Sequence, residues 1–152
     1  MDYHAYESMF NEVSPLGDVL VGEGNFSEIH GELGYLFLNS IIKTLGGDYA
    51  ILLLVIAFLG IGILCYSSYA YSLFPITAIF LYFNRFFFFF FMGQIRAGVA
   101  AALFIFSIKY IEERQLYKFL GIIIIACLFH KVAAIGIFVY FLSRFRFKSK
   151  HY

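Results

Sequence analysis

Long apolar tracts fill the chain between residues 48 and 142, and short polar or charged stretches separate them. The tracts run over residues 49–66, 70–92, 97–110 and 119–142. A helix needs about 20 apolar residues to cross the hydrocarbon core of a bilayer. Helices suit this environment because all their backbone polar groups are hydrogen-bonded within the segment. The pattern therefore predicts an all-α, polytopic transmembrane protein with about four apolar membrane segments within residues 48–142.

Short polar or proline-containing interruptions mark where the predicted segments end or bend. They fall at Ser67-Ser68-Tyr69, Pro75, Asn84-Arg85, Gly93-Gln94-Ile95-Arg96, the charged loop 109–118 and His130-Lys131. Pro is tolerated in membrane helices where neighbouring groups repair the lost hydrogen bond. Small residues over 97–102 predict that the third segment approaches another helix closely.

The first 47 residues are more polar and divide into two parts. Residues 1–31 form an acidic segment rich in turn formers, without the basic start and apolar stretch of a signal peptide. Residues 32–47 contain an amphipathic helix over about 33–45, with a polar side of Asn39, Ser40 and Lys43. Gly46-Gly47 ends this helix. Its length of about 12 residues is too short to cross a bilayer, so we expect it to lie at the membrane interface.

Composition excludes a soluble domain. Of the 152 residues, 62% are hydrophobic and 14% are charged, whereas soluble domains have about 45–50% apolar and about 25% charged residues. A small domain has too much surface to hide this excess in a core. Cys65 and Cys127 lie inside apolar tracts without metal-binding spacing, so we expect buried free thiols.

The charges are distributed unevenly, and their distribution predicts the orientation of the chain. Eight of the 10 acidic residues lie in the first 48 residues, where Lys43 is the one basic residue. Basic clusters follow in the loop 109–118 and in the tail 143–152. Because short basic loops stay in the cytoplasm, we predict an extracytoplasmic segment 1–31 and a cytoplasmic tail 143–152. The bases form no dense patch beside polar sequence, so no nucleic-acid partner is expected.

The last apolar tract, 119–142, allows two topologies. A single span would place one basic cluster outside the membrane, against the charge rule. A re-entrant hairpin bent at His130-Lys131 would leave both clusters inside, but each arm would have only about 11 or 12 residues. We favour the hairpin. Both forms place His130 and Lys131 within the membrane or near its outer half.

Ionisable side chains inside or beside the apolar tracts are candidates for function, because intramembrane charges are costly. They are Arg85, Arg96, His130 and Lys131. The predicted topology brings the acidic segment, with Glu28, His30 and Glu32, to the membrane face of Arg96 and His130. Plainer interpretations exist: the arginines can snorkel to head groups, Lys131 can anchor the chain, and His130 can bond a backbone carbonyl. No nucleotide-binding, hydrolase or zinc motif is present, so no metal and no cofactor are expected.

Three stretches, in order, resemble sequence elements of the EpsG family. The first, residues 31–36 (GELGYL), resembles its E-P-G-Y element, and the second, residues 93–100 (GQIRAGVA), resembles R-Q-x-x-A at a helix start. The third, residues 126–133 (ACLFHKVA), resembles A-x-x-F-H-K-S-A. Leu33, Ala97 and Val132 depart from the family's Pro, Gln and Ser. The resemblance covers roughly residues 1–145. Because family members are about twice as long or more, we expect a truncated member without a span before Asp2 or after Tyr152.

The resemblance implies a Wzy-like polymerase of exopolysaccharide, capsule or O-antigen synthesis, a multi-pass protein of the cytoplasmic (inner) membrane. Such enzymes join polyprenyl-diphosphate-linked oligosaccharide repeats on the outer face of that membrane, and a chain-length regulator and a flippase are further implied partners. By resemblance, Arg96 binds the diphosphate with help from Lys131. Either Glu32 or His130 is the base for the acceptor hydroxyl, and Tyr35 and Gln94 contact the substrate.

Two other functions fit the same residues. A transporter or flippase for a lipid-linked or anionic substrate would use the same intramembrane charges, although the sequence has no convincing internal repeat of the kind common in transporters. An inactive membrane remnant would fit the short length. Transport assays in vesicles would distinguish a transporter from a polymerase, and retained polymer length with Arg96→Ala would refute the polymerase interpretation.

Overall fold

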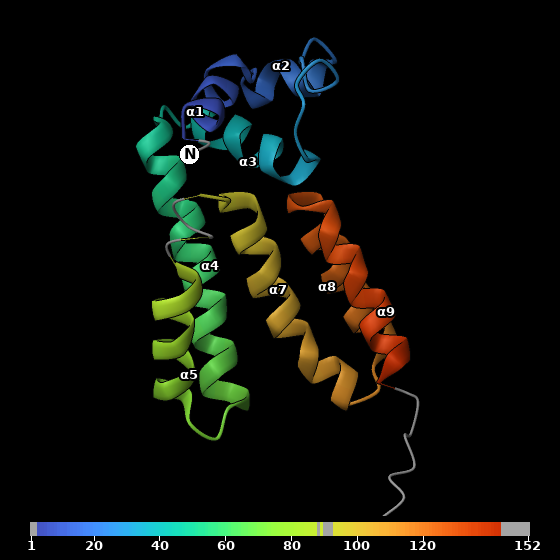
Figure 1. Ribbon diagram of the computed structural model, residues 1–152. Helices are drawn as coiled ribbons and strands as arrows, with labels where there is room; N and C mark the ends of the chain where they lie inside the picture. Colours follow the sequence, from blue (N-terminus) through green and yellow to red (C-terminus); the bar gives the residue numbers. More distant parts are fainter. Residues whose placement is uncertain (1–2, 88, 90–92, 144–152) are drawn as a thin grey trace, which may run out of the picture.

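The computed structural model describes residues 3–87, 89 and 93–143, and within this part of the chain every regular element is a helix. Figure 1 shows α1 (Tyr3–Glu12), α2 (Leu16–Val21) and α3 (Leu33–Thr44) lying across one end of a bundle. The bundle consists of α4 (Tyr49–Tyr71), α5 (Pro75–Tyr82), α7 (Ile95–Glu112), α8 (Leu116–Phe129) and α9 (Ile135–Leu142). The π-helical turn η1 (Phe83–Phe87) follows α5, and the 3₁₀ turn η2 (Lys131–Ala134) joins α8 to α9. The predicted all-α class is confirmed.

Helix α4 is longer than its apolar pattern predicted. Asp48 caps its start, where the carboxylate accepts a hydrogen bond of 2.9 Å from the Ile51 amide. The predicted break at residues 67–69 is wrong, because the helix continues to Tyr71. The Ser67 hydroxyl donates to the Ile63 carbonyl at 2.7 Å, so this polar side chain is satisfied inside the helix and does not end it.

The second predicted segment is divided differently from its pattern. Residue 70 belongs to α4, and Pro75 does not interrupt a helix but begins α5, where its missing amide hydrogen costs nothing. Asn84-Arg85 produces no break either, since both residues lie in the π-helical turn η1. The Arg85 guanidinium lies 5.6 Å from the centre of the Phe86 ring. Residues 88 and 90–92 of the phenylalanine-rich run lie outside the described residues.

The third and fourth tracts form α7 and a helical hairpin. The charged loop predicted over 109–118 is much shorter, because α7 continues to Glu112 and α8 begins at Leu116. The α8 and α9 helices are antiparallel: the Phe119 and Tyr140 rings lie 4.9 Å apart, and Gly136 packs against Ile123. The chain therefore reverses direction at residues 130–134, as in the bent alternative, and the start of α8 and the end of α9 lie at the same end of the bundle (Figure 1).

The acidic segment 1–31 contains two helices that its turn formers concealed. Lys43 of α3 holds the end of α1, because its ammonium donates to the carbonyls of Phe10, Asn11 and Val13 at 3.3, 2.8 and 2.7 Å. The buried residues Tyr6, Phe10 and Val13 lie on one face of this N-terminal segment. Segment 1–31 is thus a packed layer over the bundle as far as it is described.

Helix α3 confirms the predicted helix over 33–45, and the chain leaves it through Gly46 with a φ of +76°. Its polar side does not face solvent as an amphipathic surface helix would. Asn39 and Ser40 are fully buried, and the Ser40 hydroxyl donates to the Ser14 carbonyl at 2.8 Å. Ser40 and Lys43 therefore satisfy backbone groups of the N-terminal layer, whereas the Asn39 amide donates to the Tyr35 carbonyl within α3.

Among the described residues, α4 is the one helix both long and apolar enough to cross a membrane. Only 28% of its apolar window is buried inside the protein, and residues such as Leu54 and Phe58 are largely exposed. Shorter apolar helices run over Leu116–Phe129 and Lys131–Leu142. A core helix of a soluble protein would be mostly buried, so the exposure of α4 favours contact with lipid.

Candidate functional site

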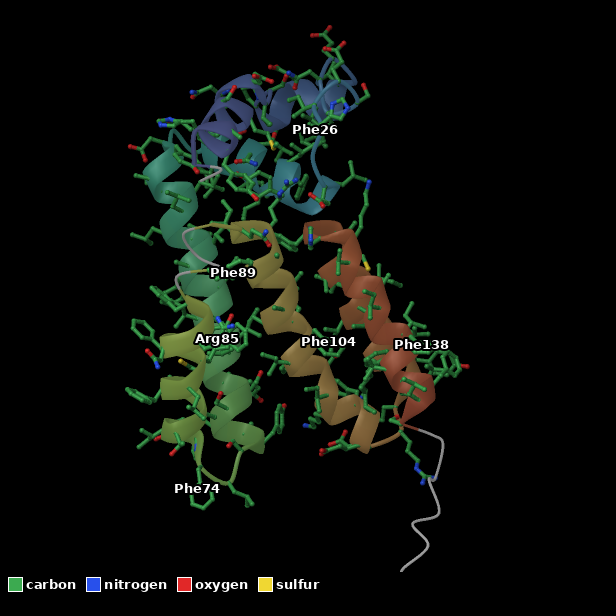
Figure 2. The ribbon with its side chains drawn as sticks, in the orientation of Figure 1. Phe26, Phe74, Arg85, Phe89, Phe104 and Phe138 are labelled. Carbon is green, nitrogen blue, oxygen red and sulfur yellow. The ribbon has the colours of Figure 1, made fainter. Side chains whose placement is uncertain are left out.

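The ends of three helices meet beneath the N-terminal layer and bring together side chains far apart in sequence. Glu32 directly precedes α3, Arg96 lies in the first turn of α7, and His130 directly follows α8. Figure 2 shows polar side chains gathered around these helix ends, whereas Arg85 lies partway along the bundle. The structure thus places the three residues predicted as catalytic in one cluster and leaves Arg85 out of it.

A single carboxylate joins the cluster. The Arg96 Nη1 donates to Glu32 Oε2, and the His130 Nδ1 lies 3.2 Å from Glu32 Oε1. Each carboxylate oxygen therefore has its own partner. The Glu32 side chain is 12% exposed and that of Arg96 is 22% exposed. The pair is partly withdrawn from water, which strengthens its electrostatic interaction, yet it remains open to a ligand.

Two aromatic rings hold the guanidinium of Arg96. Its Cζ lies 5.1 Å from the centre of the Tyr6 ring and 5.7 Å from that of Tyr35, within the range of cation–π attraction. The rings of Tyr6 and Tyr35 themselves meet edge to face at 5.8 Å. Arg96 is thus fixed from α1 and α3 before any ligand binds.

Tyr35 is fully buried, and burial raises the pKa of its phenol. The hydroxyl therefore stays protonated, and the ring forms part of the wall behind Arg96. Tyr6 was not among the predicted site residues. Its signal was present in the sequence, since Tyr6, Met9, Phe10 and Val13 have the i, i+3, i+4, i+7 spacing of a helix face.

A polar cavity of about 340 Å³ opens beside the cluster. It is lined by Ser27, Ile29, His30, Gly31, Glu32, Arg96 and Lys131. Lys131 is exposed and lies at η2, so it contributes a second cation to the space in front of Arg96. Glu28, which was expected on the same membrane face, is exposed and does not line the cavity.

An apolar groove of about 370 Å³ lies next to this cavity, between α7 and the η2–α9 segment. Its walls include Ala97, Ala101, Phe104, Ala133 and Val139. His130 also lines the groove, although its Nδ1 contacts Glu32. Gln94 is exposed and lines the groove instead of joining the ionic cluster. His130 therefore lines the groove and contacts Glu32, which lines the polar cavity.

The small residues of α7 serve two purposes. Gly98, Val99, Ala100 and Ala102 are buried, which agrees with the predicted close approach of this segment to neighbouring helices. Ala97 and Ala101 are less buried and line the groove. Among the described residues, no group of three or more His, Cys, Asp or Glu side chains could hold a metal ion, and Cys65 and Cys127 are free.

These features define an all-helical protein with an exposed apolar helix and an ionic cluster of Glu32, Arg96 and His130 beside a polar cavity and an apolar groove. The chain matches the model of the EpsG family over residues 1–152, and it belongs to that family. The predicted family is confirmed, and membership indicates a polysaccharide polymerase-type role with a lipid-linked polysaccharide substrate. The comparison with curated proteins gave no match, and the comparison with solved structures gave none either.

This chain departs from the family's sequence elements at three positions, and each of the residues present fits its place in the structure. Leu33 takes the place of Pro at the first position of α3, where the amide has no partner within the helix and either residue fits. Ala97 and Val132 both line the apolar groove. The three departures therefore leave Glu32, Arg96 and His130 in contact.

Proposed function

We propose that this chain is a membrane polysaccharide polymerase that joins polyprenyl-diphosphate-linked oligosaccharide repeats. The observation that carries the proposal is the cluster of Glu32, Arg96 and His130 at the edge of a polar cavity. A diphosphate leaving group needs cations, and a hydroxyl nucleophile needs a base. The cluster offers both within a few ångströms.

The proposal includes a placement in the cytoplasmic membrane, which the length and exposed apolar surface of α4 support. On this proposal α4 spans the bilayer, α5 with η1 and α7 lie beside it, and the N-terminal layer with α3 lies at the outer face. With a rise of 1.5 Å per residue, the 14 residues of α8 extend about 21 Å, which is less than the hydrocarbon thickness of about 30 Å. A hairpin of α8 and α9 that starts and ends in the cytoplasm therefore holds His130 below the outer surface, and α3 dips to the same depth.

Arg96 and Lys131 receive the diphosphate. The guanidinium is a planar fork that fits phosphate oxygens, and an ammonium adds a mobile point charge. The rings of Tyr6 and Tyr35 restrict the movement of the Arg96 guanidinium. As the bond between the anomeric carbon and the diphosphate breaks, these two cations stabilise the negative charge that develops on the leaving oxygen.

His130 is the base, and Glu32 positions it. With a proton on Nδ1 donated to Glu32 Oε1, the second ring nitrogen Nε2 accepts the proton of the acceptor hydroxyl. The hydroxyl oxygen then bonds to the anomeric carbon, and the diphosphate leaves on its lipid. Both oxygens of Glu32 are engaged by Arg96 and His130, which favours an orienting role for this carboxylate. Gln94 and the exposed part of the cavity are available to bind sugar hydroxyls. A flippase and a chain-length regulator are the proposed partners of the protein.

The test is the length of the surface polysaccharide in cells whose own copy of the gene has been deleted. Cells that express Arg96→Ala should produce a single repeat in place of a ladder, with the protein still in the membrane fraction. Arg85→Ala is the matched control, because this arginine lies outside the cluster and contacts the Phe86 ring. An unchanged ladder with Arg96→Ala would refute the proposal.

A further inference from the structure

The apolar groove between α7 and the η2–α9 segment begins where the ionic cluster ends. His130 borders the groove, and its Nδ1 contacts Glu32, which lines the polar cavity together with Arg96 and Lys131. The two spaces therefore adjoin: Arg96 and Lys131 line the cavity, and the next residues along the chain, Ala97 and Val132, line the groove. A ligand that matches both spaces has an anionic head and an apolar tail.

The groove is long enough for a chain and not only for a side chain. Gln94 and Phe104 both line it, and ten residues of helix separate them by about 15 Å. The Phe104 ring reaches Gly136 of α9, where an added Cβ would lie 2.9 Å from it, so the ring closes the space between the helices at that depth (Figure 2). Alanines make up much of the wall above it, which keeps the groove open.

Two other apolar hollows lie away from the cluster. One is lined by Leu54, Phe58 and other residues of α4 alone, and another lies between α4 and Leu103 and Phe106 of α7. Neither is lined by a neighbour in sequence of Glu32, Arg96 or His130. Of these three apolar hollows, the groove is the one that adjoins the polar cavity.

We infer that this groove binds the polyprenyl chain of a lipid-linked substrate whose diphosphate occupies the polar cavity. The identity of the lipid rests on the proposed function, while the position of the tail rests on the adjacency of the groove and the cationic cavity. Two cations, Arg96 and Lys131, face the head group, which favours a diphosphate over the single phosphodiester of a common phospholipid. The groove then fixes the direction in which the diphosphate departs.

Two adjacent alanines provide a matched pair of variants. Ala133 lines the groove, whereas Ala134 is exposed and does not line it, and both belong to η2. Ala133→Phe should fill the groove, and Ala134→Phe should point the same added bulk elsewhere. Ala101→Phe fills the groove from α7 and checks that the effect does not depend on the geometry of η2.

The experiment uses the full chain in phospholipid nanodiscs and two photoreactive probes. One is a polyprenyl diphosphate with a diazirine in the isoprene units near the head, and the other is a phospholipid with a diazirine in its acyl chain. The polyprenyl probe should label α7 and α9 in the unchanged protein and in Ala134→Phe. Labelling should fall about tenfold in Ala133→Phe and in Ala101→Phe, while all three variants still bind inorganic diphosphate.

Each other result overturns the inference in a distinct way. Undiminished labelling of both groove variants would place the tail elsewhere, and equal labelling by the phospholipid probe would make the groove a site for bulk lipid. Loss of inorganic diphosphate binding in both groove variants would mean that no separate tail site exists. A failure of the proposed polymerase function is distinguishable, because the polysaccharide ladder would then stay unchanged in Arg96→Ala cells while the polyprenyl probe still labelled the groove.

Discussion

Replacing Glu32 by Gln should strengthen diphosphate binding and weaken catalysis at the same time. Glutamine keeps an oxygen that can accept from Arg96 Nη1, so the guanidinium stays in place. It removes a negative charge from the edge of the cavity where a diphosphate would bind. Its amide group would then donate to His130 Nδ1, which moves the imidazole proton to Nε2 and removes the proposed base.

The size of the binding effect follows from Coulomb's law. Two unit charges about 5 Å apart repel each other by about 3 kcal/mol at an effective dielectric constant of about 20. The Glu32 side chain is 12% exposed and the cavity is open, so solvent screening reduces the effect to about half, which corresponds to roughly a tenfold gain in affinity. Loss of a general base should lower the rate of chain growth by about a hundredfold or more.

Calorimetric titration of inorganic diphosphate into the purified protein measures the first effect, and the polysaccharide ladder measures the second. Glu28→Gln is the matched control, because Glu28 belongs to the same segment but is exposed and does not line the cavity. It should change neither result. Weaker diphosphate binding by Glu32→Gln, or an undiminished ladder, would refute the roles assigned to Glu32 and His130.

Two further substitutions test how the N-terminal layer supports the site. Tyr6→Leu removes a ring 5.1 Å from the Arg96 guanidinium and should weaken the binding of inorganic diphosphate several-fold. Tyr6→Phe keeps the ring and should bind diphosphate like the unchanged protein. Equal losses of binding in both variants would indicate that the Tyr6 hydroxyl, and not the ring, supports Arg96. Lys43→Met removes an ammonium that bonds three carbonyls of the N-terminal layer and should lower the free energy of unfolding by about 2 kcal/mol in denaturant titrations. Lys118→Met, at an exposed lysine of α8, is its control, and equal stability of the two variants would contradict the proposed role of Lys43.

The parts of the fold that the sequence predicted well are those with a local cause. Helix α3 begins and ends where its apolar periodicity and Gly46 indicate, and α7 follows the apolar tract after Gln94. The all-α class could be predicted from the apolar composition alone. The predicted break at residues 67–69 was wrong because the Ser67 hydroxyl donates to the Ile63 carbonyl, and the sequence pattern does not show this hydrogen bond.

The N-terminal layer was missed because its stability comes from contacts with α3 and not from its own sequence. Pro15 and several glycines indicate turns, yet α1 forms before Pro15, and α2 forms between Pro15 and Gly22. The polar side of α3 predicted a surface, yet Asn39 and Ser40 are buried against this layer. Long-range pairing of this kind, as between Ser40 and Ser14, is set by the tertiary arrangement alone.

The residues of the candidate site could be predicted from the sequence, but their contacts and individual roles could not. Charges in or beside apolar tracts identified Arg96 and His130, and the family resemblance added Glu32. The sequence did not predict that the Glu32 carboxylate would contact both of them. The same is true of Tyr35, which was expected to contact substrate and lies fully buried behind Arg96.

The sequence separation within the ionic cluster has a consequence for biosynthesis. Glu32 pairs with a residue 64 positions later and with another 98 positions later. A ribosome therefore synthesises Glu32 long before Arg96 and His130, and the contact between Glu32 and His130 can form only after α8 has been made. Until Arg96 has also been made, the carboxylate of Glu32 lacks both partners, and its desolvation is unfavourable. Closure of the N-terminal layer over α7 and α8 is therefore a late step in the assembly of the bundle.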